Sequence, residues 1–298
     1  MDTTSDISTA RLEEFAKLQR IENRSRAVRK LFRNKGSVVG IVLLLIIFLA
    51  AIVGPYLTGY DYMEMSTDVL QAPSSKHLFG TDFYGRDTLS RTLSAAGTSI
   101  LISIIATGIS TILGVSLGMI SGFYGKAVDR IVSGFNDVLM AVPALLLVIM
   151  TVTVFGRSRV ASIGAISIAF MPGTMRLSRG QVLSIKQREF VLALKSMGIS
   201  DVQILYKHIM PNVMAPVIVS ATITVGFGVM IESMLSYVGL GVPIPDCSLG
   251  SLIMEGRPFA MTAWWLTTMP GLFIALIIMG FSLFGDGLRD VNDFRDLS

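Results

Sequence analysis

Six long apolar stretches divide this chain and restrict it to folds that a lipid bilayer can hold. A helix needs about 20 consecutive apolar residues to cross the hydrocarbon core. The fourth stretch is the weakest, because it is short and contains Pro172 and Gly173. The sequence therefore predicts an all-α polytopic membrane protein with six transmembrane helices. The predicted spans are 37–57, 98–120, 136–155, 160–175, 213–237 and 263–285.

The placement of lysine and arginine predicts the orientation. An even number of spans puts both termini on one side, and short loops rich in these residues stay in the cytoplasm. With a cytoplasmic amino terminus, 19 of the 25 cationic side chains lie inside and six lie outside. We therefore predict that both termini are cytoplasmic. The pI near 9.3 follows from this asymmetry, so a nucleic acid partner is not needed to explain it.

One membrane domain with short appendages is the simplest organisation. A basic amphipathic helix over 8–33 is expected to lie on the inner lipid surface, although a disordered tail explains the same composition. Asp87 is placed to cap a helix that runs into the second span, and a short helix is expected around 249–256. The predicted segments are 1–36 (cytoplasmic), 37–287 (membrane domain), 58–97 and 239–263 (extracytoplasmic), 176–212 (cytoplasmic) and 288–298 (cytoplasmic tail).

Few polar side chains fall within the spans. Ser103 and Thr107 belong to a run of small and hydroxyl residues in the second span, which indicates close helix packing or a pore lining. Glu232 lies late in the fifth span, and a charge inside a bilayer normally faces protein or a wet cavity. Glu232 and its neighbour Ser233 are therefore candidates for the translocation path or outer gate, with a structural hydrogen bond as the alternative. Asp137 is expected to start a helix at the inner interface.

A polar, helical interlude at Glu189–Asn212 separates two apolar spans. Gly198 is expected to end a first helix in the left-handed conformation, and Ser200 with Gln203 forms the pattern of a capping box. Pro211 is expected to end the second helix. Each arm carries an apolar stripe at three- and four-residue steps. Such a stripe needs a cover, which is either a partner protein or the chain's own membrane domain.

Catalytic and metal-binding patterns are absent from the sequence. It holds two histidines and one cysteine, Cys247, and contains neither an HExxH motif nor a GxxxxGK[ST] loop. We therefore expect no catalytic residue, no metal site and no ATP site of the latter kind on this chain.

Five motifs then resemble one family. They are LFGTDFYGRD at 78–87, DVLMAVPALLL at 137–147, the 189–212 interlude ending in HxxPN, LSYVGLGV at 235–242, and GDGLRD at 285–290. In this order and topology they resemble the second of the two paired permease subunits of binding-protein-dependent ABC importers, in the peptide and nickel branch. The family's Glu-Ala-Ala triplet reads Leu192-Ala193-Leu194 here, so the contact of its glutamate is in doubt.

The resemblance implies a type I permease fold, a location in the inner membrane of a prokaryote, and a set of partners. These are a second permease, two ATPase subunits that carry ATP and Mg²⁺, and an extracytoplasmic substrate-binding protein. The 189–212 hairpin would insert into a groove of an ATPase. The residues implied for that coupling are Glu189, Ala193, Met197, Gly198, Ile199, Ser200, Asp201, His208, Pro211 and Asn212, and Asp82, Arg86 and Asp87 join the candidates for the path or gate.

Other functions remain open from the sequence. Peptides are the favoured cargo, and nickel or a metal chelate is the alternative. A self-sufficient secondary transporter or channel is disfavoured because no inverted repeat or buried ion-coupling pair is visible. A membrane enzyme is disfavoured by the missing catalytic groups.

Overall fold

A computed structural model describes residues 29–293, without the side chains of 55–57 and 292–293. The amphipathic helix expected over 8–33 falls largely outside these residues, as do residues 294–298 of the expected tail, whereas residues 288–293 form the end of a long helix. Helices are the only extended regular elements in the described chain. They are α2 (Lys35–Leu57), α3 (Thr88–Tyr124), α4 (Lys126–Met140), α5 (Ala144–Phe155), α6 (Arg159–Ile185), α7 (Glu189–Ser196), α8 (Asp201–Gln203), a π-helical segment (Ile204–Ile209), α9 (Met210–Tyr237), α10 (Leu249–Gly256), a 3₁₀ turn (Arg257–Phe259) and α11 (Trp265–Asp293).

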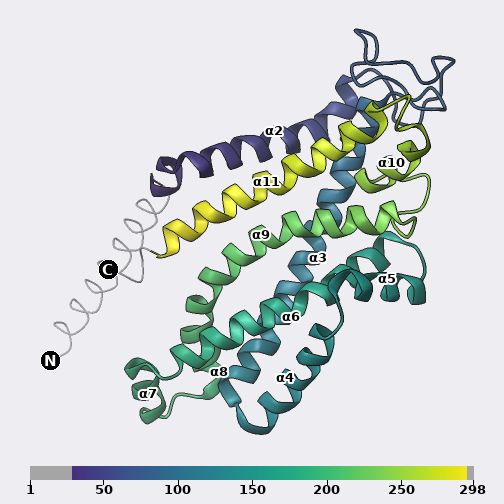
Figure 1. Ribbon diagram of the computed structural model, residues 1–298. Helices are drawn as coiled ribbons and strands as arrows, with labels where there is room; N and C mark the ends of the chain where they lie inside the picture. The colour runs from purple at the N-terminus through teal and green to yellow at the C-terminus, as the bar shows by residue number, and fades with distance from the viewer. Residues whose placement is uncertain (1–28, 294–298) are drawn as a thin grey trace.

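The long helices run side by side, with α3 between α6 on one flank and α2, α9 and α11 on the other (Figure 1). Five helical stretches of residues 29–293 are long and apolar enough to cross a membrane, or six if the bent pair α4–α5 counts as one span. The predicted multi-pass helical fold is therefore confirmed.

Small residues bring α3 and α6 into close contact. Gly114, Gly118 and Gly122 recur every fourth residue along the face of α3 that meets α6. A Cβ atom on Gly118 would lie 2.4 Å from the backbone oxygen of Met175, too close for any side chain. Ser178 also donates from Oγ to the backbone oxygen of Gly114. The small residues of the second span therefore serve packing, one of the two roles that the sequence allows.

The third predicted span is wrong as a single continuous helix. The chain bends by 91° between α4 and α5. Pro143 lies at the break and caps α5, because proline donates no backbone hydrogen bond and keeps the preceding residue out of the helical conformation. Asp137 does not start a helix; it is exposed in the last turn of α4, with Oδ1 3.5 Å from Nη2 of Arg176.

The fourth predicted span is longer than expected. Pro172 does not interrupt it, because α6 continues from Arg159 to Ile185 with the proline inside. Contact with α3 along most of this length compensates for the single hydrogen bond that proline removes. The predicted cytoplasmic segment 176–212 consequently starts inside a helix, and the separate hairpin begins only at α7.

The bundle has two distinct ends (Figure 1). We call the end with α7, α8 and the start of α2 the hairpin end. Asn34, which caps α2 there, donates to Asp290 near the end of α11 at 2.6 Å. The opposite end, which we call the loop end, carries residues 58–87, 238–248 and α10. The helix predicted at 249–256 is present, and Asp87 caps α3 by accepting from the Ser90 N–H at 2.8 Å, as predicted.

Candidate functional site

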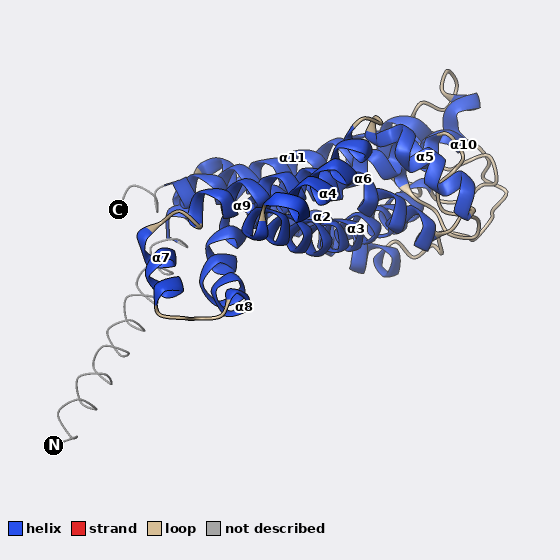
Figure 2. Cartoon of the chain, turned by 90° about the horizontal axis from the view of Figure 1, so that it is seen from below, coloured by secondary structure: helices blue, strands red, loops and turns tan. Residues whose placement is uncertain are grey.

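A helical hairpin made of α7, a tight turn and α8 protrudes from the bundle (Figure 2). Gly198 lies in its turn with φ of 75°, the left-handed conformation that glycine adopts without steric cost. Its N–H donates to the Lys195 backbone oxygen at 3.0 Å, and Ile199 N–H donates to that of Leu194 at 3.2 Å. The predicted glycine turn is confirmed.

Ser200 begins the second arm, as the sequence predicts. Its Oγ accepts from the Gln203 N–H at 3.4 Å. The reciprocal bond from the Gln203 side chain does not form in the described chain, so the capping box is only half made.

The second arm continues directly into a membrane helix. The prediction that Pro211 ends it is wrong, because residues Asp201–Tyr237 form one helical stretch. A π-helical segment, Ile204–Ile209, precedes the proline, and Met210 N–H donates to the Leu205 backbone oxygen five residues earlier. Pro211 follows directly after this segment, in the first turn of α9, so the helix continues through the proline. A rotation of the hairpin would therefore act on α9 without an intervening loop.

One face of the hairpin packs on the chain's own bundle. Val191, Ile204 and Ile209 are fully buried, and Leu205 is nearly so. They join Phe123 and other side chains of α3, α6 and α9 in one apolar cluster. The alternative in which the hairpin folds back on its own domain is therefore correct for this face.

The rest of the hairpin surface is exposed and includes five large apolar side chains. We call this the coupling face; its exposed fractions are 75% for Met197, 60% for Val202, 53% for Leu192, 52% for Tyr206 and 40% for Phe190. Both arms thus expose large apolar side chains, alongside exposed polar ones such as Glu189 and Asp201. Exposed apolar groups gathered on one protruding element are typical of a protein interface.

The ten predicted coupling residues all lie in or beside this hairpin, but not on one face. Ile199 and His208 are half-buried, and His208 accepts through its backbone oxygen from the Asn212 amide at 2.8 Å. The others are exposed: Glu189, Ala193, Met197, Gly198, Ser200, Asp201, Pro211 and Asn212. Val202 belongs to the apolar stripe that the sequence predicts, whereas Leu192 and Tyr206 were missed as exposed apolar residues; Tyr206 follows Val202 by four residues, a spacing that could have indicated it.

Glu232 is fully buried where three helices meet. Its carboxylate accepts from Oγ of Ser99 in α3 and Oγ of Ser236 in α9, each at 2.7 Å. The Ser248 hydroxyl, which caps α10, donates to Ser236 Oγ at 2.9 Å, and the Leu249 N–H donates to Ser99 Oγ at 3.2 Å. This network supports the structural alternative for Glu232, since it joins α3, α9 and the start of α10.

The three other candidates for the translocation path within the spans, Ser103, Thr107 and Ser233, are also buried. Ser103 donates back to the Ser99 backbone oxygen at 2.8 Å. The hydroxyls of Thr107 and Ser233 make no hydrogen bond within the described chain. None of these three, nor Glu232, lines the two grooves described below.

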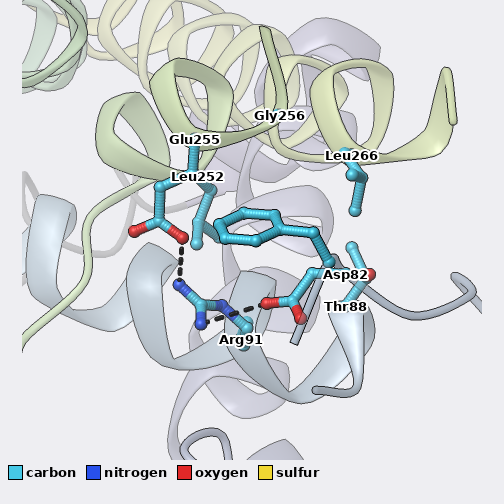
Figure 3. A pocket seen from close by; sticks show the side chains of 8 residues that line it. Asp82, Thr88, Arg91, Leu252, Glu255, Gly256 and Leu266 are labelled. Atoms are coloured by element: carbon cyan, nitrogen blue, oxygen red, sulfur yellow. Dashed lines mark hydrogen bonds and ion pairs between the residues drawn. The ribbon is translucent and has the colours of Figure 1, made fainter. Parts of the chain in front are cut away.

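At the loop end, a charged cluster joins α10 to α3 and the 58–87 segment. Figure 3 shows Arg91 between the carboxylates of Asp82 and Glu255, and the corresponding N–O distances are 3.2 and 2.8 Å. Arg86 contacts the same two acids, at 2.7 and 3.1 Å. Asp87 lies nearby, paired at 2.9 Å with Nδ1 of the buried His77. The candidates Asp82, Arg86 and Asp87 therefore lie together in one region.

Arg91 and Glu255 were missed by sequence reasoning. Arg91 follows Asp87 by one helical turn, which is a recognisable signal, but the partner Glu255 is 164 residues away. The pKa of the Glu255 carboxyl is raised above its usual value, because the effect of burial exceeds the lowering effect of the neighbouring Arg86.

Two grooves open along α6 and α9. One, of about 420 Å³, lies at the α4–α5 bend and is mostly apolar, with Pro143, Phe170 and Phe227 in its wall. The other, of about 760 Å³, lies at the hairpin end between α6, α9 and the end of α11, and Arg188 and Arg289 line it. Both include Ser220, so they meet on α9.

Sequence comparison places this geometry among known proteins. Residues 114–295 match the family model described as the binding-protein-dependent transport system inner membrane component. Residues 24–73 match the N-terminal TM domain of oligopeptide transport permease C.

Two curated relatives cover nearly all of the chain. The dipeptide transport system permease protein DppC of Alkalihalophilus pseudofirmus is 37% identical over 90% of this chain and 88% of that protein. The oligopeptide transport system permease protein OppC of Bacillus subtilis is 40% identical over 87% and 86%. A solved structure of the MetNI methionine ABC transporter, in an inward-facing conformation, has a chain that superposes with a TM-score of 0.55. It is 19% identical and covers 68% of this chain and 95% of its own, which shows a shared fold.

Proposed function

This chain belongs to the binding-protein-dependent transport system inner membrane components, and from that premise we propose that it forms half of the translocation pathway of an ATP-driven peptide importer. It is a transport subunit, as its relatives are, and not itself an enzyme. The observation that carries the proposal is the coupling face, an exposed surface with large apolar side chains on a hairpin that is continuous with a membrane helix.

Peptides are the proposed cargo. The relatives matched over most of the chain are named for dipeptide and oligopeptide transport. Nickel or a metal chelate is not favoured by these relatives. The alternative of a self-sufficient transporter or channel is not favoured, because the chain belongs to a family of binding-protein-dependent transport components.

The proposed assembly has four kinds of partner around this chain. A second permease of similar fold completes the pathway, two ATPase subunits bind ATP and Mg²⁺, and an extracytoplasmic binding protein delivers the peptide. Lipid surrounds the bundle. The coupling face has the chemistry for an ATPase groove, because Met197, Val202 and Tyr206 release water from apolar surface on docking.

Coupling follows from the two faces of the hairpin. When the ATPase pair closes on ATP, a displacement reaches the coupling face. The buried face, with Val191 and Ile209, passes it to the apolar cluster that includes α3 and α6. The continuous helix from Asp201 to Tyr237 passes it along α9. The bundle then alternates between inward-open and outward-open arrangements.

We propose that the hairpin end is cytoplasmic, in the inner membrane of a prokaryote, with both termini on that side. The positive-inside bias, 19 cationic side chains against six, supports this orientation.

Co-purification followed by reconstitution tests the proposal. An affinity tag on this chain is expected to retain a second permease and the ATPase subunits in fixed ratio. Proteoliposomes of that complex, supplied with binding protein and ATP, are expected to take up labelled tripeptide. Uptake by this chain alone, without an ATPase, would contradict the proposal.

A further inference from the structure

A small cavity lies at the loop end, where α3, α10, the start of α11 and the 58–87 segment meet (Figure 3). Its volume is about 20 Å³, and six of its eight lining residues are buried. One buried water needs about 10–15 Å³, so the cavity is large enough for one water and too small for a peptide. The lining residues are Asp82, Phe83, Thr88, Arg91, Leu252, Glu255, Gly256 and Leu266.

The hydroxyl of Thr88 is the feature that points to a ligand. Thr88 is only 4% exposed, and its Oγ1 makes no hydrogen bond within the described chain. The backbone groups of this residue are both satisfied, because its N–H donates to the Gly80 oxygen at 3.0 Å and its oxygen accepts from the Thr92 hydroxyl at 2.7 Å. A buried hydroxyl without a partner costs free energy, and most such groups in folded proteins bond protein or ordered water.

The charged groups around the cavity balance one another. Two carboxylates line it, from Asp82 and Glu255, and Arg91 lies between them (Figure 3). A second guanidinium, that of Arg86, contacts the same two acids from outside the lining. An added cation or anion would therefore meet a nearby charge of its own sign. A small neutral molecule that both donates and accepts hydrogen bonds fits this lining, and water has these properties.

We propose that this cavity binds one ordered water molecule, which hydrogen-bonds Oγ1 of Thr88 and joins it to the charged cluster. A buried water makes about three hydrogen bonds, and the lining offers polar groups of Asp82, Arg91 and Glu255 besides the hydroxyl. Both arginines donate to Oε2 of Glu255, so its Oε1 lies outside the arginine contacts. The water adds a link between the first turn of α3 and α10, beside the Arg91–Glu255 pair. This inference does not depend on the proposed function.

A density map of the purified complex, at a resolution that shows ordered water, tests the site directly. We expect one peak within about 2.6–3.2 Å of Oγ1 of Thr88 in the wild type, and the same peak in Thr88→Ser, which keeps the hydroxyl. Thr88→Val keeps the shape of the side chain and removes the hydroxyl, so the peak should lose occupancy. A wild-type map that resolves Thr88 and Glu255 but shows no peak in the cavity would overturn the proposal. Contacts shorter than about 2.4 Å, typical of a metal ion, would also overturn it.

Thermal unfolding gives a second test, because the sign of the change depends on the water. With a bound water, Thr88→Val removes a hydrogen bond and should lower the melting temperature by about 2–4 °C. Without one, valine replaces an unsatisfied buried hydroxyl, so the melting temperature should stay the same or rise. Thr88→Ser should shift it less than Thr88→Val does. Thr67→Val, exposed at the same end and outside the lining, is the control. An unchanged or higher melting temperature for Thr88→Val would contradict the water site.

Discussion

Oγ of Ser99 donates to the buried Glu232 carboxylate at 2.7 Å and accepts from the Leu249 N–H at 3.2 Å, so a single hydroxyl in α3 connects α9 to the start of α10. Ser236 and Ser248 complete the connection from the other carboxylate oxygen. The network lies at the junction of the bundle with the loop end, where α10 begins.

Glu232→Leu is expected to destabilise the bundle by about 2 kcal/mol or more, because the buried hydroxyls of Ser99 and Ser236 lose their acceptor. Glu232→Gln retains one acceptor oxygen and should cost less. Thermal unfolding of the purified chain in detergent measures both, with the exposed Glu64→Leu as control. A wild-type melting temperature combined with lost transport would return Glu232 to the translocation path.

Glu255→Gln should loosen α10 from α3. Arg91 is nearly buried and would lose its charged partner at 2.8 Å, while Asp82 remains at 3.2 Å. We expect a loss of about 1–3 kcal/mol in the free energy of unfolding and faster proteolysis within 238–264. Glu64→Gln serves as the matched control at the same end. Unchanged proteolysis would show that the charged cluster does not hold α10.

The hairpin's two faces should respond differently to a buried or exposed charge. Met197→Asp places a carboxylate on the coupling face, so the chain should fold normally and lose ATPase subunits on co-purification. Val191→Asp places one in the apolar cluster, so the hairpin itself should unfold. Ile199→Asp should show both defects, because Ile199 is half-buried. Retention of the ATPases by Met197→Asp would exclude Met197 from the interface.

Thiol labelling tests the orientation. Burial raises the pKa of Cys247 to about 12, so this thiol should be inert, and Cys247→Ser gives a silent background. Single cysteines at Ser74 and Met261, both exposed at the loop end, should react in intact cells with an impermeant reagent, and one at Ser200 should not. Ser251 is a poor reporter because it is buried. Labelling of Ser200 from outside would reverse the orientation.

Local chemistry explains which parts of the fold were predictable. Span hydrophobicity, the glycine turn at Gly198, the Asp87 cap and the short α10 helix each depend on residues close together in sequence. Two of the prolines that misled prediction show the limit. Pro143 lies at the break in a span that hydrophobicity alone predicts to be continuous. Pro211 follows a π-helical segment, and no residue pattern in the sequence predicts that segment.

The sequence predicts where the hairpin lies, but not which of its apolar side chains are buried and which are exposed. The hairpin's boundaries follow from Glu189 and Gly198, yet only packing against Phe123 and the rest of the bundle decides that Ile204 is covered and Val202 is not. The Glu255–Arg91 pair and the hairpin-end groove join residues far apart in the chain, so periodicity cannot reveal them.

The most direct test of the coupling claim is ATP hydrolysis and peptide uptake measured on the same proteoliposomes carrying Gly198→Val. Nothing lies within 4 Å of a Cβ atom added at Gly198, so the substitution acts only through its positive φ, at a cost of about 1–2 kcal/mol in the turn. Gly134→Val is the control, because Gly134 lies within α4 without a positive φ and an added Cβ atom there also meets nothing within 4 Å. We predict normal membrane insertion, abolished uptake, and either weaker retention of the ATPases or hydrolysis no longer matched to uptake. Wild-type uptake with wild-type ATPase retention would contradict the assignment of this hairpin as the coupling element.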